Sequence, residues 1–169
     1  NQRINRTGGP KGQVHLRRKR MANASTTGFG LRPIKKVGQT DNVGALTEYS
    51  VAASSALISH ACMVQLTADG VVLASGNTDA NNLGTLNGVF YTDADTNKPT
   101  FANFSKASNT ATDIVAFVND DPRQVYEIMS ADTAFNQNEV GGCADQVAAV
   151  GTTPLFISQS KISATTSAS

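Results

Sequence analysis

The side chains that could carry out chemistry are few in this sequence. The histidines are His15 and His60, and the cysteines, Cys62 and Cys143, lie far apart. His60 and Cys62 are two residues apart, but no second pair of ligands has the spacing of a zinc site. Motifs for a nucleophile elbow, a P-loop or a dinucleotide-binding turn are also absent from the sequence. These patterns predict no catalytic residue, no metal ligand and no cofactor, and we interpret the chain as a protein without enzymatic activity.

One loop has carboxylates at the spacing of a calcium site. Asp93, Asp95 and Asn97 match the first ligand positions of an EF-hand loop. An EF-hand then requires glycine, where this chain has Lys98, and an acid at the twelfth position, where it has none. We therefore interpret 93–99 as a polar turn between two strands.

Charge is distributed unevenly along the chain. Residues 1–36 contain ten of the fourteen lysines and arginines and no acid, which gives a formal charge of +10. The remaining residues contain four bases and thirteen acids, which gives −9. A basic segment joined to an acidic body predicts contacts with an acidic protein neighbour, including another copy of the chain. The basic segment lacks interleaved aromatic residues for stacking on bases, so we expect no specific nucleic-acid binding.

The first twenty residues, which we call the arm, are too poor in apolar side chains to pack a core. They end in Arg17, Arg18, Lys19 and Arg20, directly before Met21. Two hypotheses fit this pattern. The arm is either a genuine basic extension, or translated upstream or added sequence ahead of a natural start at Met21. An intact-mass measurement on native protein separates the two hypotheses.

No apolar run follows the basic residues, so the N-terminal region does not have the pattern of a signal peptide. No window of the sequence approaches the roughly 18 apolar residues of a membrane helix, and we expect no membrane contact. The sequence predicts synthesis in a reducing cytoplasm, where Cys62 and Cys143 would be buried or half-buried free thiols.

Residues 21–43, which we call the strap, predict an extended segment. Glycines at 28 and 30 and the proline at 33 disfavour a helix. One interpretation is a strand packed on the body of the same chain, and the other is a segment that docks on an acidic groove of a neighbouring subunit. The predicted partner-binding residues in the arm and the strap are Arg17, Arg18, Lys19, Arg20, Phe29, Leu31, Arg32, Ile34, Lys35 and Lys36.

The body, 44–160, predicts short β-strands separated by turns. Its charged fraction is low, and serine, threonine and asparagine are abundant. We expect strands at 46–51, 61–66, 71–74, 85–92, 112–118 and 124–129, a tight Asp69-Gly70 hairpin turn, a bulge or a close backbone approach at Gly88, a short helix within 135–150 and a frayed tail over 161–169. The predicted fold class is mainly β: a small β-barrel or β-sandwich with an extended basic N-terminal arm.

Three stretches of the sequence resemble a group of small structural proteins of tailed phages, many of which infect marine bacteria. The stretches are MANAS at 21–25 followed by GFGLRPI at 28–34, NGVFYTD at 87–93, and TDIVAFVNDDPRQVYEI at 112–128. The resemblance spans roughly 21–132. The family start falls at Met21, and a further strand would be expected after Ser169.

The resemblance implies a β-rich cement or decoration protein, present in many copies on the outside of the capsid. It implies the major capsid protein and other copies of the chain as partners, with synthesis in the bacterial host cytoplasm and a final location on the virion surface. The alternative is a receptor- or glycan-binding module on a phage fibre or tail. The absence of tryptophan and the scarcity of other aromatic residues argue against a sugar-binding platform.

Overall fold

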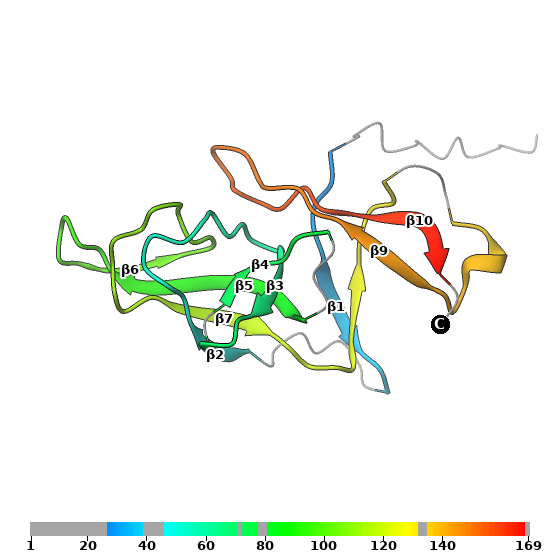
Figure 1. The fold of residues 1–169 in the computed structure, drawn as a ribbon, viewed down its shortest axis with the longest axis horizontal. Coiled ribbons are helices and arrows are strands. Elements are labelled where there is room, and N and C mark those ends of the chain that lie inside the picture. The colour runs from blue at the N-terminus through cyan, green and yellow to red at the C-terminus, as the bar shows by residue number, and fades with distance from the viewer. Residues whose placement is uncertain (1–26, 39–45, 71, 78–80, 132–134, 168–169) are drawn as a thin grey trace, which may run out of the picture.

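The computed structural model describes residues 27–38, 46–70, 72–77, 81–131 and 135–167, and the arm lies outside these residues (Figure 1). The described residues form antiparallel strands and a single 3₁₀ turn, and they contain no α-helix. The predicted mainly-β fold class is therefore confirmed. The strands do not close into a barrel, and the arrangement is a sandwich-like β fold.

The larger sheet has six strands in the order β2-β7-β5-β3-β4, with β6 paired to β5. These strands are β2 (Thr47–Ser50), β3 (Met63–Leu66), β4 (Val72–Ala74), β5 (Asn82–Thr92), β6 (Pro99–Ala102) and β7 (Val115–Asn119). The longest of them is β5, which pairs with β3, β6 and β7. Its register with β7 shifts between Leu86 and Gly88, so the predicted bulge is confirmed.

The hairpin predicted around Asp69-Gly70 is also confirmed. β3 and β4 are antiparallel, with Val64 opposite Ala74 and Leu66 opposite Val72. Gly70 has a φ of +75°, and its N–H donates to the carbonyl of Thr67 over 3.0 Å. Glycine adopts this left-handed conformation without the steric penalty of a Cβ, which explains why the turn forms there.

The core lies on one face of the six-stranded sheet. It is built from aliphatic side chains that alternate along the strands, because successive residues of a strand point to opposite faces. Its fully buried members include Ile58, Val64, Leu86, Val89 and Val118. The segment before β3 closes this core: the Ala61 N–H donates to the Leu86 carbonyl over 2.9 Å, and the Leu86 N–H donates to the Cys62 carbonyl over 3.0 Å.

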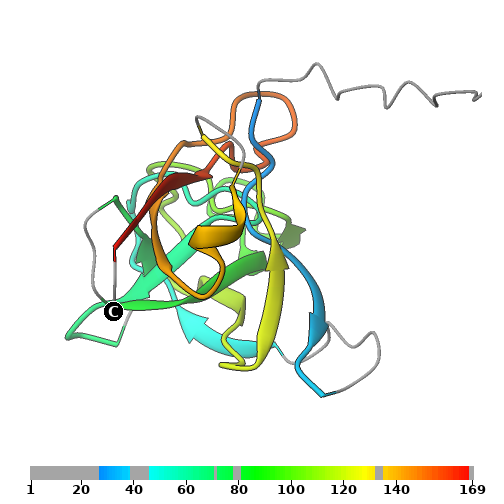
Figure 2. The ribbon, with the colours of Figure 1, turned by 90° about the vertical axis from the view of Figure 1, so that its right-hand side faces the viewer.

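The other half of the molecule contains two separate two-stranded antiparallel sheets. β1 (Arg32–Lys36) pairs with β8 (Gln124–Glu127), and β9 (Cys143–Val147) pairs with β10 (Lys161–Ser167). A parallel bridge between Ser130 and Ile162 joins the two pairs. In Figure 2 this half of the molecule faces the viewer, and strands of the six-stranded sheet lie behind it.

Two predictions for this half are wrong. The expected frayed tail is a strand over 161–167, because its backbone pairs with β9. The helix expected within 135–150 is reduced to the 3₁₀ turn Gln137–Glu139, and β9 follows it. Gly141 adopts a φ of +86° between the two elements, which ends any helical path.

The turn between β5 and β6 is held by carboxylates. Asp93 accepts hydrogen bonds from the backbone N–H groups of Asp95 and Thr96, and both oxygens of Asp113 accept from the Thr92 N–H over 3.1 Å. Hydrogen bonds from Thr96 lower the pKa of Asp93, and hydrogen bonds from Thr92 lower the pKa of Asp113. The EF-hand-like segment is thus a hairpin turn, as predicted.

These lowered pKa values predict sensitivity to acid. A carboxylate whose pKa is lower in the folded state stabilises the fold above its unfolded pKa of about 3.9, and this stabilisation is lost as pH falls through the folded value. We expect the midpoint of thermal unfolding to stay level from about pH 7 to about pH 5 and to fall below about pH 4. Differential scanning calorimetry tests this, and Asp113→Asn is expected to show a shallower decline. An equally steep decline in that variant would contradict the role of Asp113.

Candidate partner-binding site

Residues 28–31 of the strap contact the body of their own chain. The Leu31 N–H donates to the carbonyl of Ala61 over 2.9 Å. Gly30 has a φ of +73°, and a Cβ added to it would lie 2.3 Å from the Ala61 oxygen. A Cβ on Gly28 would lie 2.1 Å from the Gln159 oxygen. The two glycines therefore allow the strap to cross the body in direct backbone contact, which supports the interpretation of a strand packed on its own body.

β1 leaves part of the predicted site exposed. Its register with β8 shifts between Pro33 and Lys35, next to Ile34, which is 40% exposed. Arg32 and Lys35 are also exposed. Arg32 lies at 4.0 Å from a Glu127 carboxylate oxygen, and both side chains remain largely in solvent. Such an exposed pair contributes little to stability, so the Arg32 guanidinium is available to a partner.

Lys36 and Leu31 require a correction to the predicted partner-binding set. Leu31 is 8% exposed, and the Lys36 side chain is 9% exposed with its Nζ at 2.7 Å from Asp121 Oδ2. Both side chains are occupied within their own chain, because the strap is packed on its own body. Arg17, Arg18, Lys19 and Arg20 lie outside the described residues.

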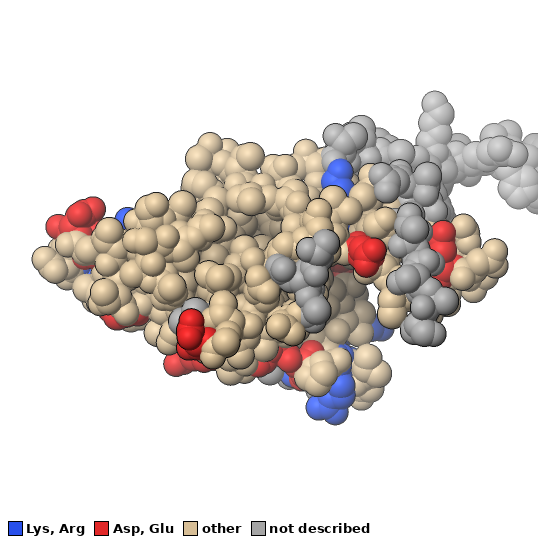
Figure 3. Space-filling view, in the orientation of Figure 1, with Lys and Arg blue, Asp and Glu red and all other residues tan. Residues whose placement is uncertain are grey.

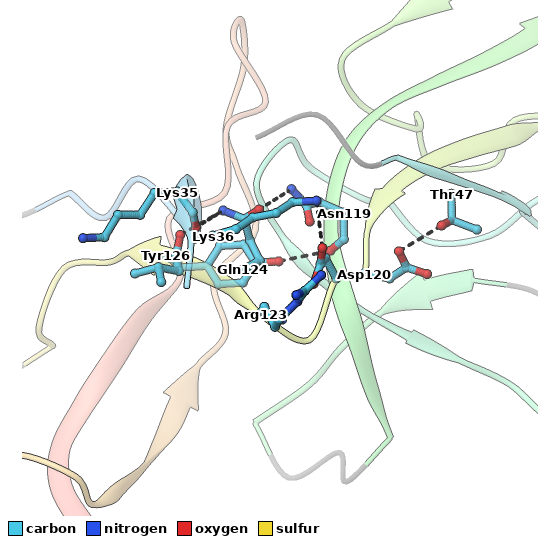
Figure 4. Close-up of polar contacts among 10 residues, drawn as sticks. Lys35, Lys36, Thr47, Asn119, Asp120, Arg123, Gln124 and Tyr126 are labelled. Carbon is cyan, nitrogen blue, oxygen red and sulfur yellow. Dashed lines mark hydrogen bonds and ion pairs between the residues drawn. The ribbon is translucent and has the colours of Figure 1, made fainter. Parts of the chain in front are cut away.

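The Asp120-Asp121 turn connects the two halves of the molecule (Figure 4). Asp120 accepts hydrogen bonds from Thr47 Oγ1 over 2.9 Å and from the Tyr49 hydroxyl over 2.7 Å, both on β2. Asp121 pairs instead with Lys36 on β1. The Lys36 ammonium is the main cause of the lowered pKa of Asp121. Adjacent carboxylates therefore hold strands from different sheets.

A glutamine completes this connection. Gln124 Nε2 donates to the Lys35 carbonyl over 2.8 Å, and its Oε1 accepts from Asn119 Nδ2 over 3.3 Å. The Tyr126 hydroxyl donates to the Asn119 carbonyl over 3.0 Å. These contacts place β1 at a fixed position beside the end of β7, as Figure 4 shows.

Replacing Lys36 with methionine is expected to lower the thermal unfolding midpoint, because Asp121 would lose its buried cationic partner. Lys35→Met is the matched control, since Lys35 is the exposed neighbour on the same strand. We expect this control to stay close to the wild type. Equal midpoints for the two variants, measured by circular dichroism, would contradict the internal role of Lys36.

An apolar cleft of about 430 Å³ lies beside β1. Its walls come from β1, from the segments before β2 and β3, and from β5 and β7 of the large sheet. It is lined by Phe29, Arg32, Pro33, Leu46, His60, Ala61, Thr85, Leu86, Asn87, Asn119 and Ile157. The lining is mostly apolar, with a guanidinium at one side. Clefts of this composition accommodate apolar groups and orient them through a few polar contacts.

A second hollow of about 400 Å³ adjoins the cleft and shares Phe29 and Ile157 with it. Leu155, also in its lining, is 65% exposed. His60 lies at the junction of the chain segments: its Nδ1 is 3.0 Å from the Asn87 carbonyl, and its backbone forms a parallel bridge with Ile157. Residues 155–157 were not predicted to belong to the site. The only signal there was a short apolar run.

Among the described residues, no group of three or more His, Cys, Asp or Glu side chains is arranged so that it could bind a metal ion. Cys62 is buried as predicted, and burial raises the pKa of its thiol to about 11, so it is protonated at neutral pH. Cys143 is a free thiol but is exposed, contrary to the prediction, because it lies on the outward face of β9.

The structure thus defines a small antiparallel β domain with an apolar cleft beside an exposed basic strand. Within the described ranges, no helix has the length and apolar character needed to cross a membrane. No protein-family model, curated protein sequence or solved structure matches the chain.

Proposed function

We propose that the chain is a structural virion protein that binds the outside of a tailed-phage capsid lattice and stabilises it. The proposal begins from the sequence resemblance to capsid cement and decoration proteins. The observation that carries it further is the apolar cleft at Phe29 with exposed Arg32 and Lys35 beside it. This combination suits an apolar anchor flanked by carboxylates on a neighbouring protein.

The surface chemistry agrees with a protein partner. Two segments, 49–68 and 146–160, contain no charged residue, and the His60–Ile157 bridge brings them together. In Figure 3 much of the central and upper part of the face shown is uncharged, with acidic groups mainly along its lower edge, at its left end and to the right of its centre. Protein interfaces are depleted of charge at their centre and polar at their rim, so this face is suited to contact with a lattice.

The major capsid protein is the proposed partner, together with neighbouring copies of the chain. Each contact can be weak, since a lattice repeats it many times and effective concentration multiplies its effect. A fixed β body contributes by limiting the conformational entropy lost on binding. Lys36, Asp121 and Gln124 supply that rigidity at β1.

Cosedimentation tests the proposal. Capsids of a tailed phage that encodes this chain, prepared without it, are mixed with the purified protein and pelleted. We expect the wild type to pellet with capsids. We expect the affinity of Arg32→Glu for capsids to be lower by about tenfold or more, because one charge at the interface is reversed. Lys98→Glu is the control for net charge, because Lys98 is exposed in the β5–β6 turn, away from the cleft lining.

Failure of the wild type to pellet would contradict the proposed function itself. Equal loss of binding in Arg32→Glu and Lys98→Glu would instead indicate a general electrostatic effect and exclude the cleft as the contact. Binding to host-cell glycans by the isolated protein, with no binding to capsids, would support the fibre or tail module in place of the capsid role.

A further inference from the structure

The outward face of the six-stranded sheet carries an unusual set of aromatic side chains. On β5 and β7, Val89 and Ala116 are fully buried in the core. Phe90, Phe101 and Phe117 alternate with core residues and belong to the opposite face of the sheet. Phe101 is 68% exposed and Phe90 is 39% exposed. The water-facing side of an antiparallel sheet is ordinarily polar, so three phenylalanines there call for an explanation.

These side chains are neighbours in space. Phe90 and Phe101 are opposite each other on β5 and β6, and the rings of Phe101 and Phe117 have centroids 5.6 Å apart. Phe101 lies over Gly88, since a Cβ added there would be 3.5 Å from Phe101 Cε1. Covering Gly88 accounts for one side of the Phe101 ring. The larger part of its surface remains in water.

The charged residue in register with these side chains is acidic. Glu48 on β2 is the register partner of Phe117 and is exposed. The register partners of the three phenylalanines include no lysine or arginine. We call Phe90, Phe101, Phe117 and Glu48 the aromatic patch.

We propose that the aromatic patch of one copy binds the basic end of the arm, 17–20, of a second copy. Guanidinium groups stack on aromatic faces and pair with carboxylates, so Arg17, Arg18 and Arg20 match both components of the patch. The first 36 residues have a formal charge of +10 without a single acid, whereas the remainder carries −9. The inference rests on the self-association included in the proposed function. The contact between copies can be measured without any capsid.

The arm leads into the described chain in the half of the molecule that does not contain the aromatic patch. The described chain starts at Thr27, beside Gln159, in the half of the molecule that contains β1, β9 and β10. β6 lies at the far end of the other half (Figure 1). Seven residue steps separate Arg20 from Thr27, and an extended chain covers at most about 25 Å over that length. Contacts between different surfaces of successive copies generate rings or open arrays, which suits a repeating lattice.

Sedimentation velocity on the full chain, 1–169, tests the contact without any capsid. We expect self-association that increases with protein concentration and weakens between about 0.05 M and about 0.5 M NaCl, because exposed ion pairs are screened by salt. Phe101→Ser is expected to weaken the association about tenfold or more. Val140→Ser is the matched control, since Val140 is 74% exposed and lies outside both the patch and the cleft lining. Equal effects of the two variants would overturn the proposal.

A charge-reversal cycle gives the decisive comparison. Glu48→Lys and Arg18→Glu are each expected to weaken self-association several-fold, and the double variant is expected to recover part of the loss. Equal association by the chain shortened to 21–169 would exclude the arm as the occupant. A protein that stays monomeric at every concentration would also overturn the inference. Neither result would bear on capsid binding, which the cosedimentation experiment measures separately.

Discussion

Gly30→Ala is expected to lower the midpoint of thermal unfolding by about 8 °C or more. The substitution places a Cβ at 2.3 Å from the Ala61 oxygen at a residue whose φ is +73°. The left-handed backbone costs an L-residue about 1–2 kcal/mol, and the backbone overlap raises the total to about 4 kcal/mol. A domain of this size loses about 2–4 °C per kcal/mol. Calorimetry or circular dichroism measures the shift.

Gly70→Ala separates the two contributions to this effect. Gly70 has a nearly identical φ of +75°, but an added Cβ would have nothing within 4 Å. Its variant therefore tests the backbone conformation alone, and we expect less than half of the Gly30→Ala shift. Similar shifts for the two variants would mean that the strap does not lie against the Ala61 backbone.

Leu86→Ala is expected to destabilise the fold by about 3 kcal/mol, or roughly 6–12 °C in the unfolding midpoint. Leu86 is 1% exposed, so the truncation leaves a cavity in the core. Its backbone also bonds to both Ala61 and Cys62, which holds the segment before β3 on the sheet. We expect the variant to have a lower midpoint both in thermal unfolding and in unfolding by urea, because the loss of core packing lowers the free energy of unfolding.

Leu155→Ala is the control for this substitution. Leu155 is 65% exposed, and exposed truncations usually change stability by no more than about 0.5 kcal/mol. A Leu86→Ala midpoint within the range of this control would contradict the placement of Leu86 in the core.

The large sheet could be predicted because its signals are local. Asp69-Gly70 fixes a hairpin through the φ of one glycine, and within 46–51 Tyr49 and Val51 share the face that packs on the core, whereas Leu46 is exposed. The strand predicted at 112–118 overlaps β7, which lies between β2 and β5 in the sheet. In each case a few neighbouring residues determine the element.

β9 and β10 could not be predicted in the same way. β9 (CADQV) contains few β-branched residues, β10 (KISATTS) is rich in small polar residues, and each forms through its pairing with the other. The register between them shifts between Ile162 and Thr166, so no regular alternation marks the pair. The tail therefore had the composition of a frayed end although 161–167 are a strand.

The candidate site was predicted only in part, because some of its residues come together only through contacts between distant segments. Phe29 and Arg32 were identified from the strap, and both line the cleft. Ile157 was not, because only the fold brings it beside Phe29. Lys36 was wrongly assigned to the partner-binding residues, because the sequence around it does not distinguish it from its neighbour Lys35. Burial against Asp121 distinguishes the two lysines, and it depends on a turn 85 residues further along the chain.

Quantitative mass spectrometry of purified virions tests the central proposal most directly. The measurement compares the copy number of this chain with that of the major capsid protein, and its peptide map shows whether residues 1–20 occur in the native protein. A one-to-one ratio, or another simple fraction of the capsid lattice, is the result that the capsid role predicts. A copy number far below that of the capsid protein, or absence from the particle, would contradict it.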